Sequence, residues 1–113
     1  MALLALAIGW ASPGGAQGGS DVLNWMSGNR YLELESSHQA VIAASLGAGM
    51  QWGLIRARET DRAQQLYDCM HGWTTGQAAA VLRKWLEDNP SMRHYDISLA
   101  FDSAVYVQAC KIQ

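Results

Sequence analysis

Hydrophobic residues recur at helical spacing along much of the chain, and no segment between turn signals alternates as a strand does. The clearest case is a set of apolar residues at four-residue intervals: Ile42, Leu46, Met50 and Leu54. Small residues lie beside this face, so the pattern predicts a buried helix over residues 40–55 that packs closely against a neighbour. Three glycines inside it, at positions 47, 49 and 53, each cost about 1 kcal/mol relative to alanine, and tight packing is the expected compensation.

Two more helices are predicted in the C-terminal half. Thr74 and Gln77 have the spacing of a capping box, and Pro90 ends the helix that follows them. Its predicted apolar stripe is Ala78, Val81, Leu82, Trp85 and Leu86, with Arg83, Lys84, Glu87 and Asp88 on the opposite, solvated side. A last helix is expected over residues 96–109, and the residues turned inward are Ile97, Phe101, Ala104 and Val105.

The N-terminal half carries weaker patterns. Residues 21–26 can form a short helical turn capped by Ser20, residues 27–29 read as a break, and residues 30–37 look helical. The polar residues 56–68 either continue the preceding helix or form a charged connection. Taken together, these patterns predict an all-α fold, a small bundle of about four to five helices.

The first 19 residues, MALLALAIGWASPGGAQGG, have a short apolar run followed by small residues. This composition predicts a signal peptide, although no Lys or Arg precedes the run; the alternative is a floppy N-terminal arm. The run falls well short of the ~20 residues that a spanning helix needs, and so does the stretch 40–55, so no membrane insertion is expected. Residues 20–113 are expected to form the single folded domain.

Composition narrows the possible partners. The chain of 113 residues is 50% hydrophobic and 16% charged, which argues against intrinsic disorder and fits one domain with a modest core. A net charge of -2 gives no electrostatic footprint for nucleic acid. Arg56, Arg58 and Arg62 cluster weakly, but Glu59 and Asp61 interrupt them, as on a solvated helix face.

The two cysteines, Cys69 and Cys110, flank the two C-terminal helices. Antiparallel helices joined by a short turn bring their outer ends together, so in an exported protein this pair predicts a disulfide that staples the hairpin shut. One alternative is a zinc site in which Cys69 and His71 join Cys110 or His94, but the spacing matches no familiar ligand pattern. The other alternative is a catalytic Cys69 beside His71. Because a second cysteine is placed to bond with Cys69, the disulfide is the stronger interpretation.

No pattern for an enzyme emerges from the sequence. It contains no glycine-rich phosphate loop, HExxH helix or serine elbow, so no catalytic residue, metal or cofactor is expected. His38 and His94 are interpreted as surface or cap residues, and Asp96 as a residue that complements the dipole of the last helix. Among the tryptophans, Trp52 and Trp85 are expected in the core, and Trp73 is the best candidate for partial exposure.

A set of motifs in the C-terminal half suggests a family. The motifs are Cys69, GWTTGQ ending at Gln77, VLRKWLEDNP ending at Pro90, then His94, and AFDSAVYVQAC ending at Cys110. This succession resembles the Rap/Tai family, the immunity proteins against amidase effectors of type VI secretion systems. Upstream, SGNRYLEL and SLGAGMQWGL are similar to the family's GNxLL opening and to its GYxxGxxD helix.

The chain also departs from the family pattern. Family members usually carry a further cysteine pair, where this chain has Glu35 and the residues from Ala40 to Ala44. Met70 and His71 stand where a proline usually follows the first cysteine of the C-terminal pair. The absence of both upstream cysteines together fits the loss of one whole disulfide.

The resemblance implies a small periplasmic helical protein, often a homodimer, that occludes the active site of a cell-wall amidase and has no chemistry of its own. A segment that projects between the last two helices is the favoured contact, with Asn89, Ser91, Arg93 and His94 as the candidate partner-binding residues. Residues 56–62 are the second choice. A small periplasmic acid-stress chaperone is the alternative function, ranked second because few acids cluster to trigger it.

Overall fold

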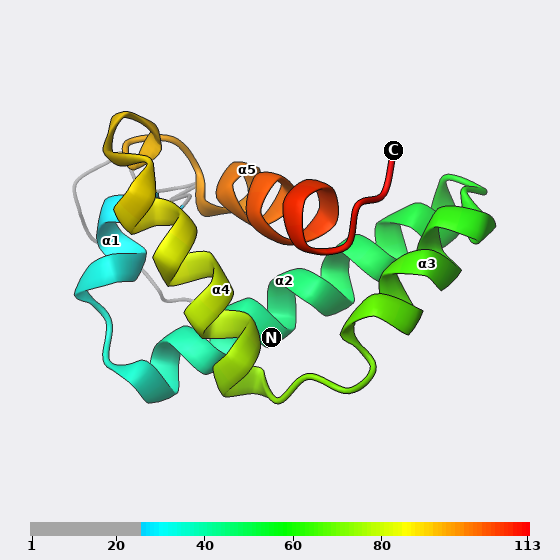
Figure 1. Ribbon diagram of the computed structural model, residues 1–113, viewed down its shortest axis with the longest axis horizontal. Helices are drawn as coiled ribbons and strands as arrows, with labels where there is room; N and C mark the ends of the chain where they lie inside the picture. The colour runs from blue at the N-terminus through cyan, green and yellow to red at the C-terminus, as the bar shows by residue number, and fades with distance from the viewer. Residues whose placement is uncertain (1–25) are drawn as a thin grey trace, which may run out of the picture.

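The computed structural model describes residues 26–113, and this part of the chain is built from helices (Figure 1). Their bounds are α1 Gly28–Glu33, α2 Ser36–Arg56, α3 Thr60–Met70, α4 Thr75–Asp88, η2 Pro90–Met92, α5 Ile97–Phe101 and η3 Asp102–Ala109. Over this range there is no strand, only an isolated antiparallel bridge between Ser27 and Asp96. The all-α fold predicted from the sequence is therefore confirmed.

Two sequence predictions concern residues before this range. The signal peptide over residues 1–19 and all but the last residue of the helical turn at 21–26 lie outside the described residues. Between residues 26 and 113, no helix is both long enough and apolar enough to cross a membrane.

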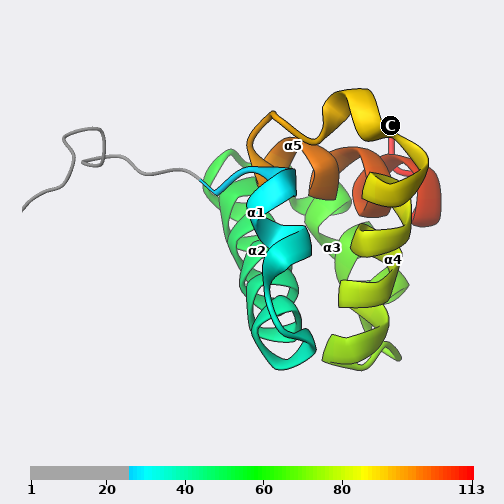
Figure 2. The ribbon, with the colours of Figure 1, turned by 90° about the vertical axis from the view of Figure 1, so that its left-hand side faces the viewer.

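The long helix α2 is the element on which α3, α4 and α5 pack, whereas α1 packs on α4 and α5. α4 and α3 both lie against α2, and the continuous helix formed by α5 and η3 crosses over α2 and α4 (Figures 1 and 2). The core between them is filled by predicted apolar residues of the last two helices, Leu82, Trp85, Leu86, Ile97, Phe101, Ala104 and Val105, and by Ala100, which was not predicted. Tyr31 from α1 and Leu66 from α3 complete it. Val81, expected in the stripe, is only half-buried.

The helix boundaries in the N-terminal half differ from the prediction. Residues 27–29 are not a break, because the Ser27 hydroxyl accepts a hydrogen bond from the Arg30 amide at 3.1 Å and starts α1 at Gly28. The predicted helix over 30–37 is also wrong, since the backbone is extended at Leu34 and Glu35 before α2 begins.

The sequence predicts either a continued helix or a charged connection over residues 56–68, and the structure shows a third arrangement. α2 ends at Arg56, the chain turns, and α3 starts at Thr60. The turn depends on Arg58, whose φ of 63° lies in the left-handed region. A separate helix therefore runs back along α2.

Tight packing explains only one of the three glycines in α2. A Cβ atom at Gly47 would lie 3.4 Å from the methyl carbon of Met70 and 3.6 Å from the Phe101 ring, but nothing lies within 4 Å of Gly49 or Gly53. The expectation for the last two positions is wrong. Trp52 is likewise not a core residue, since 60% of its surface is exposed.

The predicted start of α4 is confirmed in detail. The Thr74 hydroxyl accepts from the Gln77 amide at 3.0 Å, while the Gln77 side chain accepts from the Thr74 amide at 2.7 Å. Satisfying two orphan donors in this way fixes the first turn. α4 ends at Asp88, two residues before Pro90.

The last helix changes its winding part-way. Asp96 caps it by accepting from the Ser98 amide at 2.8 Å, and α5 then runs to Phe101. From Asp102 to Ala109 the chain continues without interruption as a π-helix, η3. The hydrophobic spacing predicted the helix but not this change.

Candidate functional site

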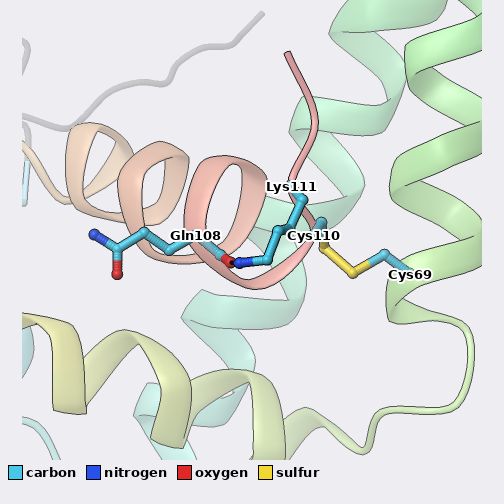
Figure 3. The surroundings of a disulfide bond; sticks show 4 residues. All are labelled: Cys69, Gln108, Cys110 and Lys111. Carbon is cyan, nitrogen blue, oxygen red and sulfur yellow. Dashed lines mark hydrogen bonds between the residues drawn. A yellow bond between two sulfur atoms is a disulfide. The ribbon is translucent and has the colours of Figure 1, made fainter.

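The two cysteines are bonded to each other, as predicted. Cys69 lies in the last turn of α3 and Cys110 directly after η3, with their Cα atoms 5.6 Å apart (Figure 3). The bond ties the end of α3 to the end of η3. It therefore closes a loop of the chain that contains α4, α5 and η3. Because both sulfurs are in this bond, neither is available as a metal ligand or a nucleophile.

The C-terminal residues after the disulfide are also held in place. Lys111 has a left-handed φ of 57°, and its ammonium donates to the Gln108 carbonyl at 2.9 Å (Figure 3). Ile112 then enters the core with 3% of its surface exposed. The end of η3 is therefore fixed by the covalent bond, a side-chain cap and an apolar anchor.

The segment from residue 89 to residue 94, here called the contact segment, joins α4 to α5. Two of its predicted partner-binding residues are turned toward α4. The Asn89 side chain donates to the Trp85 carbonyl at 2.8 Å. Arg93 donates from Nε to the Leu86 carbonyl at 2.8 Å and from Nη2 to the Glu87 carbonyl at 3.1 Å. These bonds supply donors to the last carbonyls of α4, where a helix lacks its own amide partners; the Leu86 carbonyl also accepts from the Asn89 amide at 3.3 Å.

The start of α1 holds the contact segment from its other side. The Gly28 amide donates to the Tyr95 carbonyl at 3.1 Å, and the Asn29 amide donates to the Arg93 carbonyl at 2.8 Å. This approach requires glycine, since a Cβ atom at Gly28 would lie 2.6 Å from a Leu86 methyl carbon and 3.1 Å from the Arg93 carbonyl oxygen. Hydrogen bonds from two directions therefore fix the segment.

The other two predicted contact residues, Ser91 and His94, are exposed. The His94 ring lies against the Tyr95 ring, with centroids 4.0 Å apart. Both rings line an open hollow of about 540 Å³, together with Ser27, Asp96 and Ser98. The structure thus places an imidazole and a phenol side by side at this hollow, while Ser91 is exposed outside it.

The second candidate segment, residues 56–62, is the turn between α2 and α3. Its charges are partly matched internally, because the Arg62 guanidinium lies 3.3 Å from the Glu59 carboxylate in an exposed pair. Such pairs contribute little to stability. Apart from this pair, no hydrogen bond from a side chain in this segment fixes it within the described residues.

A buried polar network was not anticipated from the sequence. Gln39 is 4% exposed, donates to the Tyr31 carbonyl at 2.9 Å and accepts from the Arg83 guanidinium at 3.1 Å. The Tyr31 hydroxyl donates to the Ala79 carbonyl at 3.2 Å. Arg83 was expected on the solvated side of α4; it is half-buried because it reaches across to α2.

Burial shifts the pKa of one member of this network. Burial raises the pKa of Tyr31 from 10.0 to about 12, and the charge of Arg83 opposes that rise. Because the Tyr31 phenol stays neutral, it keeps the proton that it donates to the Ala79 carbonyl. The effect is structural, since Tyr31 is fully buried in the core.

The residues described contain no group of three or more His, Cys, Asp or Glu side chains that can hold a metal ion. Comparisons of the chain with protein-family models, with curated proteins and with solved structures found no match. The resemblance to the Rap/Tai family therefore stays a prediction that rests on the motifs of the sequence.

Proposed function

We propose that this protein is a periplasmic immunity protein, which binds a peptidoglycan amidase effector of a type VI secretion system and occludes its active site. One observation carries the proposal: the contact segment is held by hydrogen bonds to α4 and α1 while Ser91 and His94 stay exposed. The family resemblance supplies the identity of the partner.

A fixed segment suits inhibition by occlusion. Association costs the entropy of every group that becomes ordered, so a turn that is already ordered binds at a smaller cost. Loops carried on a rigid scaffold are also the usual location of protein contacts. Within the proposal, Ser91 and His94 touch the amidase, whereas Asn89 and Arg93 position the segment that presents them.

The proposed compartment has separate support. Disulfides form and persist in oxidising compartments such as the periplasm, and this chain has one that joins Cys69 to Cys110. The apolar leader over residues 1–19 predicts export to that compartment. Periplasmic amidases act on the cell wall there, so an inhibitor meets its target before damage occurs.

The test first looks for an amidase gene beside the gene of this protein and then expresses that amidase in the periplasm of a host cell; the lack of such a gene would count against the proposal. Co-expression of the full chain should rescue growth, and the two proteins should co-purify. Replacing both Ser91 and His94 with alanine should weaken binding at least about tenfold, as for contacts near the centre of an interface. The matched control replaces Ser37 and His38, which are exposed on α2 far along the chain.

Two results would contradict the proposal. The first is an amidase that the protein neither binds nor neutralises; if the protein instead suppresses aggregation of unrelated proteins at low pH, the acid-stress chaperone is the better account. The second is equal loss of binding in the Ser91/His94 and Ser37/His38 variants. The homodimer implied by the resemblance is measured separately, by light scattering of the purified protein.

A further inference from the structure

Trp85 carries a buried hydrogen-bond donor that has no acceptor. Its side chain is 9% exposed, and its Nε1 atom is the one buried side-chain nitrogen or oxygen without a partner among residues 26–113. A buried N–H that is left unpaired forfeits the hydrogen bond it makes with water in the unfolded chain. Such groups are rare in native proteins, and each calls for a specific explanation.

The Trp85 side chain lines a cleft between α4 and η3. The cleft has a volume of about 520 Å³, and Val81, Ala104 and Ala109 give it apolar walls. One wall is the π-helix η3, and π-helical turns are uncommon and frequently occur at functional sites. The tryptophan that carries the unpaired donor and the unusual helix are independent observations, and both residue sets line the same cleft.

The charges around the cleft select an uncharged occupant. Lys84 and Asp88 both lie at its rim, and their charged groups pair with each other at 3.1 Å. The pair leaves the rim without net charge. Asn89 and Gln108 add two amide side chains, which suit the donors and acceptors of a peptide backbone.

We propose that this cleft binds an uncharged, extended peptide segment of the partner protein, and that one backbone carbonyl of that segment accepts the Trp85 Nε1–H. This inference rests on the proposed function, in which the partner is the amidase. Asn89 connects the two surfaces, because it belongs to the contact segment and also lines the cleft. The interface therefore extends from the outward turn along α4 to η3.

Entry of the peptide requires a small movement, because the Nε1 atom is shielded from solvent. Gln108 is exposed, and within the described residues no hydrogen bond holds its side-chain amide. Within the proposal, the Gln108 side chain, which lines the cleft, shifts when the peptide enters. The carbonyl then reaches the indole from the cleft, and the apolar walls pack against the side chains that flank that carbonyl.

The test follows the indole N–H signals of the full chain by nuclear magnetic resonance. The probes are a blocked alanine dipeptide, N-acetyl-alanyl-alanine methylamide, and the purified amidase. With either probe the Trp85 indole signal should shift downfield and saturate. Trp85→Phe retains an aromatic ring without the N–H and should weaken binding about fivefold, as expected for one neutral hydrogen bond. Trp73→Phe, at a half-buried tryptophan outside this cleft, should leave binding unchanged.

Three results would overturn the inference. One is a Trp85 signal that is already downfield in the free protein and returns upfield in Gln108→Leu, since the acceptor would then be internal. Another is an equal response of the Trp73 and Trp85 signals to the dipeptide. The third is equal affinity of the Trp85→Phe variant and the original chain for the amidase. This result would overturn the cleft proposal but leave the proposed function intact. Conversely, if no amidase binds, the proposed function fails while the dipeptide titration still decides the cleft.

Discussion

Tyr31 and Gln39 hydrogen-bond each other in both directions across the junction of α1 and α2. The Gln39 side chain donates to the Tyr31 carbonyl at 2.9 Å, and the Tyr31 hydroxyl lies 3.4 Å from the Gln39 carbonyl. Tyr31 and Gln39 are both buried. This reciprocal pair fixes the angle between the two helices, and through Ala79 and Arg83 it joins both of them to α4.

Removing the Tyr31 hydroxyl should lower the free energy of unfolding. Tyr31→Phe deletes the hydrogen bonds to the Gln39 and Ala79 carbonyls, and we expect a loss of about 1 kcal/mol from urea denaturation. Tyr67→Phe is the matched control, because 49% of Tyr67 is exposed, and it should change stability by less than about 0.5 kcal/mol. Equal effects of the two substitutions would contradict the importance of the network.

Stability should also fall as the pH rises from 10 to 12. The pKa of Tyr31 is about 12 in the folded protein and near 10.0 when unfolded, so above pH 10 the unfolded chain releases the proton first. The contribution is complete below pH 10 and lost as the pH passes 12, a difference of about 2–3 kcal/mol. Urea denaturation across this range measures it. Tyr31→Phe should show a shallower decline, and identical slopes would refute the assignment.

A methyl group at Gly28 should disturb the contact segment. Gly28→Ala places a Cβ atom 2.6 Å from Leu86 and 3.1 Å from the Arg93 carbonyl oxygen, and overpacking of this kind costs about 1–3 kcal/mol. Amidase binding should weaken together with stability. Gly49→Ala is the control, since its Cβ meets nothing within 4 Å and should raise stability by up to about 1 kcal/mol. A stable Gly28→Ala protein with full binding would show that the close approach is dispensable.

Loss of the disulfide should release α3 first. Replacing Cys69 and Cys110 with serine removes a link across 41 positions of sequence, for which the chain-entropy model gives about 4 kcal/mol. Hydrogen exchange should then accelerate most in α3. This helix packs on α2, and the disulfide is the covalent link that holds it to the end of η3. Uniform acceleration along the chain, or none, would contradict this order.

Arg93 and His94 are adjacent, but their replacement should have different effects. Arg93→Ala removes two charge-assisted bonds to the carbonyls at the end of α4 and should cost about 1.5–3 kcal/mol. His94→Ala alters an exposed side chain and should leave stability within about 0.5 kcal/mol while it weakens amidase binding. Thermal and urea denaturation of both variants separate the two roles. A destabilised His94→Ala protein would contradict the separate roles assigned to Arg93 and His94.

Features that depend on near neighbours were accessible to sequence analysis. Thr74 and Gln77 are three residues apart, so their capping box is a local property, and the stripe around Trp85 follows directly from helical periodicity. Cys69 and Cys110 are an exception, because they lie 41 positions apart. Their pairing is predictable because the chain has two cysteines and the helices between them are expected to fold back.

Features that depend on distant contacts were not accessible. The Arg83–Gln39 bond joins positions 44 residues apart, and the sequence alone places Arg83 on the polar side of its helix. Arg93 looks like an exposed contact residue until the carbonyls of Leu86 and Glu87 are seen within its reach. The close approach at Gly28 likewise depends on where a later segment of the chain passes.

The π-helical winding of η3 constrains how the sequence can change. A π-helix closes its hydrogen bonds five residues apart instead of four, so it turns less per residue than an α-helix does. Eight residues wound in this way determine the direction in which Cys110 faces Cys69. A one-residue deletion between Asp102 and Ala109 would rotate the following residue around the helix axis and carry its sulfur away from α3. Length variation in this helix is therefore coupled to covalent closure.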